Sequence, residues 1–358
     1  MKRIPRALVF GLSGVLLILA GCSDQTASHL ENGESNTQIF EVEYQDLHAQ
    51  RGRQPAYLEL ATGFTSETNL EAIRAPWPFA LLSIGHTSAS YQNYGGSPYF
   101  HHGLDIRGDA GTSVLASVGG RVVNVENYGP GPAYWEVAIL DDNGFVWQYH
   151  HVDRSTIPQA VLDAFKNEGR IEAGDKVGEI YYWPVTTFGE RFHHVHLNIL
   201  GAEKKFVNPF LFLEPLPDLS APKILDFGLT QNGLRVEGNE VSGTYSMFAK
   251  VHDLILHQKF VVPANSMEVS IDGAPAFSVW NFNDGLPGGA SEEQFVSNYY
   301  VPSLTCGNYT CRDLNINLGF TKTGNRGFPS QSGAHTATLT AKDAFGNETT
   351  HTYTWKVK

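Results

Sequence analysis

Between residues 78 and 214 the chain is dense in short runs in which apolar and polar residues alternate. Successive side chains of a strand point to opposite faces of a sheet, so this alternation predicts half-buried strands. Asp142-Asn143-Gly144 is typical of a tight hairpin turn. Short strands joined by hairpins indicate an antiparallel sheet. The expected strands cover residues 113–118, 121–127, 136–140, 146–152, 177–182 and 194–200.

One short helix is expected within this region. Residues 158–167 place apolar side chains at helical spacing, and Ser155 or Thr156 is a suitable cap before them. The segment 155–168 follows an expected strand directly. It is either one rim of a groove or a packed surface element.

A proline-rich linker, residues 215–222, leads into a second region. Residues 223–358 also alternate with a period of two, most clearly at 234–237, 336–341 and 351–357, which favours a β-sandwich. The turn at 342–347 resembles the closing hairpin of bacterial immunoglobulin-like modules. A length of 358 residues exceeds one typical domain. We therefore expect an all-β chain, with an antiparallel sheet domain at 78–214 and an immunoglobulin-like β-sandwich at 223–358.

Two motifs in the first domain have the spacing of metal ligands. His101 and Asp105 are four residues apart and His194 and His196 are two apart, so each pair can project from one face of an extended segment. Catalytic zinc sites typically take three protein ligands and leave the fourth position for water or substrate. A chain with 14 histidines also produces close pairs by chance. The strand-like alternation at 194–200 favours the metal site.

A third histidine-bearing segment, residues 147–152, lies between these two motifs. In order, the chain shows H-x-G-x-D at 101–105, Y-x-H at 149–151 and H-x-H at 194–196. This ordered set resembles the lysostaphin-type zinc endopeptidases, which act on peptide cross-links of bacterial cell walls. The resemblance covers about residues 78–213, including segments at 174–180 and 207–209.

The resemblance implies a role for each matched residue. It implies one Zn²⁺ per chain with His101, Asp105 and His196 as ligands, and His151 and His194 as unligated catalytic histidines. Zn²⁺ lowers the pKa of bound water toward about 7 and polarises the scissile carbonyl, while a nearby imidazole accepts or donates a proton. The chain contains no H-E-x-x-H motif, so histidine must supply the acid-base chemistry.

Each motif contains or adjoins a doubled histidine. Neighbouring side chains of a strand face opposite ways, so only one histidine of each pair is expected to face the metal. The family pattern selects His101, His151 and His194. We expect the other three to be structural or to orient the ligands; they are His102, His150 and His193.

Two positions depart from the family pattern. The loop before H-x-H usually ends in Gly-Pro and is Gly-rich, whereas residues 181–192 are rich in aromatic side chains. Asn198 stands where family members commonly have Glu. Both positions are expected to line the substrate groove, so the departures concern specificity more than catalysis.

Residues 1–22 are expected to be a lipoprotein signal peptide. Three basic residues precede an apolar run at 7–20 that is too short for a spanning helix with soluble flanks. Residues 19–22, Leu-Ala-Gly-Cys, resemble a bacterial lipobox, which implies cleavage before Cys22 and lipidation of its sulfur. Ser23 then favours the outer membrane of a Gram-negative bacterium, facing the periplasm. An ordinary signal peptide with an incidental cysteine is the alternative.

Two further segments precede the first domain. Residues 23–38 are polar and are expected to form a flexible tether with a mean reach of about 20–25 Å. Residues 39–77 are more apolar and receive no assigned role; their position just upstream of the first ligand suggests a segment that packs on the catalytic domain or covers its groove.

The net charge argues against nucleic acid as a partner, and the cysteine content indicates a disulfide. Removal of the signal peptide leaves 22 basic against 37 acidic residues, a formal net charge of −15. Such a chain lacks the basic character that nucleic acid requires. Cys306 and Cys311 are expected to form a disulfide in the oxidising envelope, and half of a metal site is the alternative.

Three functional hypotheses follow. The first is a zinc endopeptidase that hydrolyses the stem peptides or cross-links of peptidoglycan, anchored by its lipid. The second is a noncatalytic relative that binds and activates other wall hydrolases; such relatives usually lose metal ligands, and all five matched positions are present. The third is a mononuclear iron oxygenase, whose facial triad also contains two histidines and a carboxylate, but its usual H-x-D spacing is absent. The C-terminal domain is expected to bind wall or a protein partner, or to act as a spacer.

Overall fold

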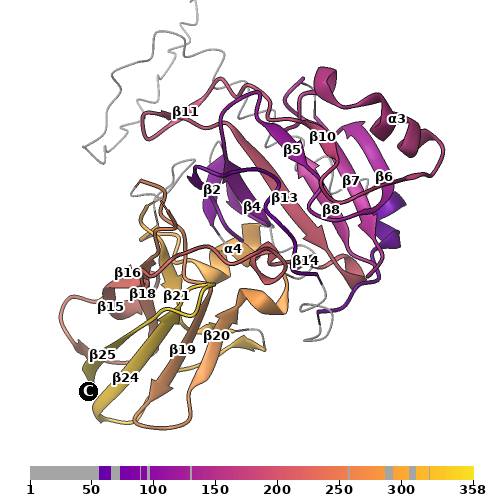
Figure 1. Cartoon of the computed structure of the whole chain (residues 1–358). Helices are drawn as coiled ribbons and strands as arrows, with labels where there is room; N and C mark the ends of the chain where they lie inside the picture. Colours follow the sequence, from indigo (N-terminus) through magenta and orange to yellow (C-terminus); the bar gives the residue numbers. More distant parts are fainter. Residues whose placement is uncertain are drawn as a thin grey trace, which may run out of the picture.

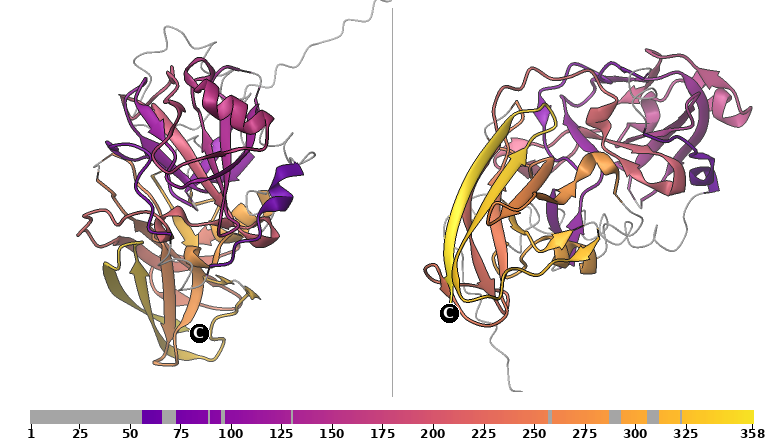
Figure 2. Two further views of the ribbon diagram at one scale, coloured as in Figure 1. Left: turned by 45° about the vertical axis from the view of Figure 1, so that its right-hand side comes forward. Right: turned by 90° about the horizontal axis from the view of Figure 1, so that it is seen from below.

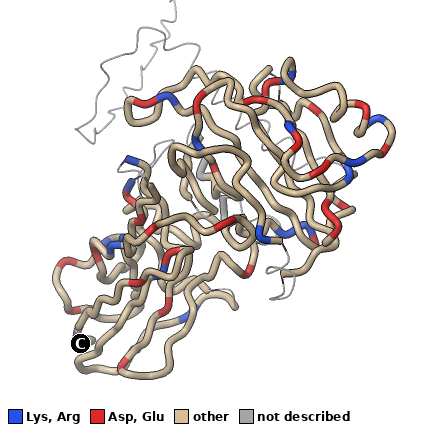
Figure 3. Tube along the Cα trace, viewed as in Figure 1, with Lys and Arg blue, Asp and Glu red and all other residues tan. Residues whose placement is uncertain are grey.

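The computed structural model describes residues 56–65, 73–88, 90–94, 97–129, 131–256, 259–286, 293–305, 312–321 and 323–358. The expected signal peptide, tether, lipidated Cys22 and disulfide between Cys306 and Cys311 lie outside the described residues. Among the described helices, none has the length and apolar character to cross a membrane. Lys and Arg alternate with Asp and Glu along the described chain rather than gathering in one segment (Figure 3).

An antiparallel sheet forms the centre of the first domain (Figure 1). Its strand order is β1-β4-β13-β8-β7-β6-β9, with β14 paired to β13. The strands are β1 (Ser83–Ile84), β4 (Leu104–Arg107), β6 (Gly120–Asn127), β7 (Trp135–Asp141), β8 (Val146–His150), β9 (Arg170–Ile171), β13 (His194–Leu200) and β14 (Phe206–Val207). This antiparallel sheet confirms the fold class expected from the alternating runs.

The two faces of this sheet differ in chemistry because side chains alternate along each strand. On one face, Ile106, Tyr149 and Val195 belong to a hydrophobic core that also contains Val161 and Ala164 of the only described helix of this domain with α-helical geometry, α3 (Gln159–Lys166). The other face carries polar residues at the centre of the sheet. These polar residues are buried, so the sheet holds a largely enclosed polar site on β4, β8 and β13.

The remaining elements of this region lie around the sheet. They are η1 (Ala56–Leu60), β2 (Tyr91–Tyr94) paired with β3 (Ser97–Phe100), β5 (Ser113–Leu115) paired with β10 (Lys176–Glu179), η2 (Arg154–Thr156), β11 (Thr186–Thr187) paired with β12 (Glu190–Arg191), η3 (Ala202–Lys204) and η4 (Pro209–Leu211). The expected caps of α3 are wrong. Ser155 and Thr156 lie in η2, which Asp153 caps, and the N-cap of α3 is Pro158, with no side-chain hydrogen bond.

The C-terminal region contains two sheets with one shared core (Figure 2). Their orders are β16-β15-β18-β21 and β17-β25-β24-β19-β20. The elements are β15 (Lys223–Gln231), β16 (Leu234–Arg235), β17 (Glu240–Val241), β18 (Ser246–His252), β19 (Ser266–Ile271), β20 (Phe277–Asn281), η5 (Phe282–Asp284), α4 (Glu293–Tyr299), β21 (Asn315–Asn317), β22 (Phe320–Thr321), β23 (Gly324–Asn325), β24 (Gly333–Lys342) and β25 (Glu348–Val357). The immunoglobulin-like assignment of this region stays a prediction.

The hydrophobic cores of the two regions interlock. Phe100, at the end of β3, packs among aromatic rings of the C-terminal region: its ring centroid lies 5.9 Å from that of Phe282 and 5.4 Å from that of Tyr299. In the opposite direction, Ile255 and Val262 belong to the core beneath the central sheet. The C-terminal region therefore buttresses the strand that leads into His101.

Residues 56–61 of segment 39–77 pack on the polar face of the sheet, whereas Ile73 and Ala75 belong to the core on its opposite face. Leu58 and Ala61 form a buried cluster with Val146 and Leu200. The hydroxyl of Tyr57 lies in hydrogen-bonding contact with Glu136. This segment therefore closes one end of the face that carries the polar residues.

Candidate metal centre and active site

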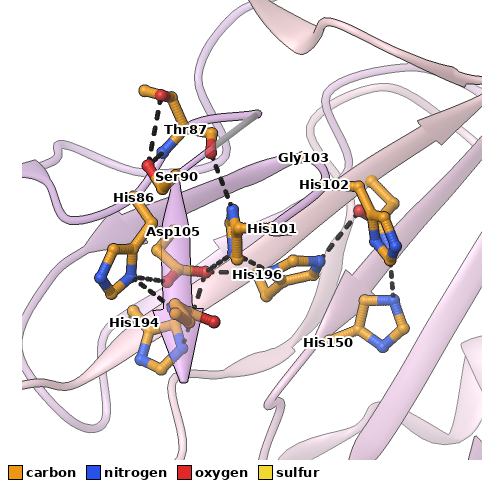
Figure 4. A network of polar contacts seen from close by, with 12 residues as sticks. His86, Thr87, Ser90, His101, His102, Gly103, Asp105, His150, His194 and His196 are labelled. Atoms are coloured by element: carbon orange, nitrogen blue, oxygen red, sulfur yellow. Dashed lines mark hydrogen bonds and ion pairs between the residues drawn. The ribbon is translucent and has the colours of Figure 1, made fainter. Parts of the chain in front are cut away.

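The strand register brings the sequence motifs together on the polar face of the sheet. His196 of β13 pairs with Asp105 of β4 on one side and with His150 of β8 on the other. Directly paired residues of an antiparallel sheet project to the same face. His101 approaches from the end of the β2–β3 hairpin, and Figure 4 shows its ring pointing toward Asp105 and His196.

Gly103 explains the glycine of the first motif. Its φ of +78° lies in the left-handed region, and a Cβ there would sit 2.3 Å from the carbonyl oxygen of Leu197. Only glycine fits so close to β13 with this backbone conformation. The close approach turns the chain sharply between the two ligand candidates His101 and Asp105.

Three donor atoms converge on one point. The Nε2 atom of His101 lies 2.9 Å from Nδ1 of His196, and each of these nitrogens lies within 3.0 Å of Oδ1 of Asp105. Donor atoms in a tetrahedral zinc site are about 3.3 Å apart, given bonds of about 2.0–2.1 Å. The triangle is thus close to the size that a shared cation requires.

The protons on the two histidines are used elsewhere. Nδ1 of His101 lies 3.0 Å from the carbonyl oxygen of Thr87, which can only accept, so this nitrogen carries the proton of the neutral ring. Nε2 of His196 lies 2.9 Å from Oδ1 of Asn198 and donates to it. The nitrogen of each ring that faces Asp105 is then unprotonated and presents a lone pair. Two lone pairs and a carboxylate oxygen in mutual contact suit a bound cation and repel one another without one.

The carboxyl of Asp105 is ionised in this setting. Burial opposes its ionisation, but the charges of His101 and His194 and the hydrogen bonds from His101 and His196, present when those rings are protonated, outweigh burial and hold the pKa of Asp105 well below the usual range. An anionic oxygen and two neutral imidazole nitrogens match the ligand types of a catalytic zinc site.

His151 and His194 lie side by side next to the triangle. Their ring centroids are 4.7 Å apart. The Nδ1 atom of His151 donates to the carbonyl oxygen of Ala133 at 2.9 Å, and that of His194 donates to the carbonyl oxygen of Phe192 at 2.7 Å. In each ring this fixes the tautomer and leaves Nε2 as the unprotonated nitrogen; in His151 the hydroxyl of Tyr128 lies 3.5 Å from it.

Both rings are neutral at neutral pH. Burial, reinforced by the neighbouring His194, holds the pKa of His151 well below its usual value. Burial also lowers the pKa of His194, to about 4. A buried neutral imidazole is the form that accepts a proton in catalysis.

The expectation that only one histidine of each pair faces the site is wrong for His150 and His151. His151 has a φ of 64°, which interrupts the strand alternation at the end of β8. As a result His150, in register with His196, and His151, beside His194, both lie on the polar face. Sequence alternation could not reveal this, because a left-handed residue is uncommon outside glycine and nothing in the sequence marks its position.

His102 and His193 have the structural roles expected of them. The ring of His102 stacks on Phe206 at a centroid distance of 4.0 Å. Nδ1 of His193 accepts a hydrogen bond from the backbone nitrogen of Trp183 at 2.9 Å. Neither is in the triangle of donors.

A buried chain of polar side chains runs from His196 across the sheet. The amide of Asn198 lies 3.3 Å from Nε2 of His150, whose Nδ1 lies 3.3 Å from the carboxylate of Glu136. Burial raises the pKa of Glu136 to about 7, against hydrogen bonds from Asn124 and Tyr57 that lower it. Asn198, the residue that departs from the family pattern, thereby orients His196.

Aromatic side chains wall the two catalytic candidates. The loop 181–192 contributes Trp183, whose ring centroid lies 4.8 Å from that of His151, and Phe192, 4.6 Å from that of His194. Phe260 of the C-terminal region packs on Phe192 at 5.6 Å. The side chain of His196 retains 14% exposure, whereas His194 retains 5%. The unusual loop is therefore part of the site rather than a remote decoration.

One residue of the site escaped the sequence motifs. Nδ1 of His86 lies 2.6 Å from Oδ2 of Asp105, and His86, His101 and Asp105 form a buried group able to hold a metal ion. His86 directly follows β1, which pairs with β4. The only signal in the sequence was a histidine at the end of an apolar run, which is too common to single out. Its contact holds Asp105 so that Oδ1 faces the other two donors.

Replacing His86 with alanine is expected to weaken metal binding about 10- to 100-fold, because partners that orient a ligand have effects of this size. Titration of the purified chain with Zn²⁺ in competition with a chromophoric chelator measures this change. His335→Ala, on β24 of the C-terminal region, serves as the matched control. Equal affinities for the wild type and H86A would contradict the orienting role.

Residues 99–209 match the model of peptidase family M23, and none of the curated proteins matches the chain. Among solved structures, a peptidase M23 protein from Pseudomonas aeruginosa shares 21% identity over 48% of this chain and 61% of its own, with a TM-score of 0.30. The catalytic domain of lysostaphin from Staphylococcus simulans shares 20% identity over 41% of this chain and 98% of its own, with a TM-score of 0.24.

This chain spans less than two thirds of the length of the Pseudomonas aeruginosa protein. The match itself spans the three histidine motifs of the site, from before His101 to beyond His196. The chain therefore carries a domain of peptidase family M23 over residues 99–209.

Proposed function

We propose that this chain is a zinc-dependent endopeptidase that hydrolyses peptide bonds in the stem peptides or cross-links of bacterial peptidoglycan. The observation that carries the proposal is the triangle of His101, Asp105 and His196 donors, with two neutral imidazoles beside it, inside a peptidase family M23 domain. Such a combination of three ligands and adjacent bases is the minimum that metal-assisted hydrolysis requires.

The chain's own residues supply the binding and the proton transfers. His101, Asp105 and His196 would hold Zn²⁺, which when bound polarises the scissile carbonyl and acidifies water. His151, fixed by the carbonyl oxygen of Ala133, accepts the proton of the attacking water at Nε2. His194, fixed by the carbonyl oxygen of Phe192, holds an unprotonated Nε2 3.9 Å from Asp105 and relays to the leaving amine the proton that His151 has taken from the water. The aromatic wall excludes water from these transfers.

The test is incubation of the purified full chain with peptidoglycan, with and without a chelator. New amino termini should appear, vanish with chelator and return when Zn²⁺ is added back. A chain that binds one equivalent of Zn²⁺ yet releases no amino termini would instead support the noncatalytic activator of other wall hydrolases. One equivalent of iron without zinc in the native protein would favour the oxygenase hypothesis.

We further propose that the enzyme is a lipoprotein of the cell envelope, anchored through Cys22 in the outer membrane and facing the periplasm. The apolar run at residues 7–20 and the lipobox-like sequence at 19–22 support this proposal. The C-terminal region is proposed to bind wall or a protein partner. The mass of the mature amino-terminal peptide tests the anchor: an unmodified Cys22 would contradict it.

A further inference from the structure

Three buried aspartates meet at the junction between the two regions. Asp218 lies in the linker that follows the first domain, Asp253 comes directly after β18, and Asp343 directly after β24. None is more than 9% exposed. A carboxylate oxygen from each lies within 4.8 Å of an oxygen from each of the other two. Stretches more than 30 residues apart thus bring three carboxylates together, none of which belongs to the donor triangle of the peptidase domain.

The described residues give these carboxylates no cationic partner. Oδ1 of Asp218 accepts a hydrogen bond from Ser220, but its Oδ2 is buried without any hydrogen-bond partner among the described residues. Among the described residues, Oδ1 of Asp253 accepts from the backbone of Leu254 alone. No described Lys, Arg or His forms an ion pair with any of the three. Burial of an unpaired carboxylate is costly unless a cation compensates it.

Asp343 is the anchored member of the group. Its Oδ1 accepts from the backbone of Phe345 and Asn347, and its Oδ2 accepts from the side chain of Asn347. The same Asn347 amide donates to the backbone carbonyl of Asp218 at 3.1 Å. Hydrogen bonds through Asn347 therefore join the turn between β24 and β25 to the linker, and they hold Asp343 close to Asp218.

The pKa of Asp253 reflects the crowding of these carboxylates. Burial, together with the charges of Asp343 and Asp218, raises the pKa of Asp253 to about 7, against a hydrogen bond from the backbone of Leu254 that lowers it. The fold thus concentrates negative charge where nothing in the described chain neutralises it.

We propose that Asp218, Asp253 and Asp343 form a binding site for a divalent calcium ion. The donors are all oxygens, which suit hard cations, whereas zinc prefers nitrogen and sulfur. Ligands on opposite sides of Ca²⁺ are about 4.6–5.2 Å apart, since each bond is about 2.3–2.6 Å. The three carboxylate oxygens lie within 4.8 Å of one another, so one such ion can reach all of them. Mg²⁺ dehydrates reluctantly and is seldom held by a dedicated group of protein carboxylates, which favours Ca²⁺.

Further ligands can come from water. A small hollow beside Asp253 is lined by Asn208, Asn265 and Ala344, so it joins the first domain to the C-terminal region next to the carboxylates. Calcium takes 6–8 oxygen ligands, often including water and carbonyl oxygens.

A cation here would fix the junction of the two regions. Phe345, two residues after Asp343, packs on Phe210 of η4 at a centroid distance of 5.1 Å. Val262 pairs with Asp253 in an isolated bridge and belongs to the core of the first domain. Binding would therefore lock the linker, the end of β18 and the β24–β25 turn into one unit and stabilise the whole chain.

Thermal unfolding of the full chain tests the proposal. At 10 mM Ca²⁺, about a hundredfold above a dissociation constant near 10⁻⁴ M, the Tm of the wild type should rise by about 5–10 °C relative to calcium-free buffer. Asp253→Asn should abolish this rise. Without calcium, its Tm should equal or exceed that of the wild type, because the variant removes a repulsive charge. A purely structural aspartate would give a lower Tm in both buffers.

Three controls separate this site from the peptidase site and from misfolding. Asp218→Asn, whose Oδ2 makes no hydrogen bond, should also lose the rise, and it decides the matter if D253N fails to fold. Glu268→Gln, an exposed position on β19, should keep the rise, as should His101→Ala at the peptidase site. An unchanged wild-type Tm, an equal rise with 10 mM Mg²⁺, a rise retained in D218N or D253N, or its loss in H101A would overturn the proposal.

Discussion

Replacing His151 with asparagine is expected to lower kcat for peptide hydrolysis by about 10²- to 10⁴-fold, the usual contribution of a positioned general base. Asparagine is chosen because it tolerates the left-handed conformation that His151 adopts, with φ of 64°. The side chain loses the Nε2 atom that accepts the proton, while the ligand triangle stays intact. Release of amino termini from peptidoglycan measures kcat, and elemental analysis checks that the metal content is unchanged.

The control for this experiment is His335→Asn. His335 contacts Asp272 and Gln331 in the C-terminal region and touches no group of the site. We expect its kcat to match that of the wild type. If H151N keeps wild-type kcat with a full complement of metal, another group accepts the proton and the assignment is wrong.

Replacing Phe100 with alanine is expected to lower the free energy of unfolding by about 3–5 kcal/mol, the range for removal of a buried phenylalanine. The ring is fully buried and contacts Phe282, Phe295 and Tyr299. A loss of this size is a large share of the 5–15 kcal/mol that stabilises a typical protein. Urea unfolding followed by circular dichroism measures it.

Phe100→Ala should also weaken Zn²⁺ binding, because the packing of the Phe100 ring fixes the backbone that leads directly into His101. Leu234→Ala, at a position 65% exposed on β16, should change stability by less than about 0.5 kcal/mol and leave metal binding intact. A variant F100A as stable as L234A would show that the interlocking of the two cores contributes little.

The sequence allowed the central strands and the spacing of the site to be predicted because both depend on local periodicity. The strand expected at 194–200 is β13, and the hairpin at Asp142-Asn143-Gly144 joins β7 to β8. The ordered motifs named the five residues that the structure gathers on one face of the sheet. Their individual roles in catalysis stay predictions.

The contacts that orient these residues were not predictable in the same way. His86, Glu136 and Tyr57 reach the site from segments without any motif, through register and packing that only the folded sheet defines. Strict alternation places His150 and His151 on opposite faces, but the left-handed backbone of His151 brings both to the same face. The meeting of Asp218, Asp253 and Asp343 likewise depends on long-range topology, which sequence spacing does not encode.

The packing of Phe100 against Phe282 has a consequence for the order in which the molecule is built. The two rings are about 180 residues apart in the chain, an interval that a ribosome covers in roughly 10–40 s at 5–20 residues per second. Until Phe282 has been synthesised, Phe100 at the end of the β2–β3 hairpin lacks one of the aromatic rings against which it packs. The peptidase site is therefore completed late in the life of the nascent chain, when most of the polypeptide has already been made.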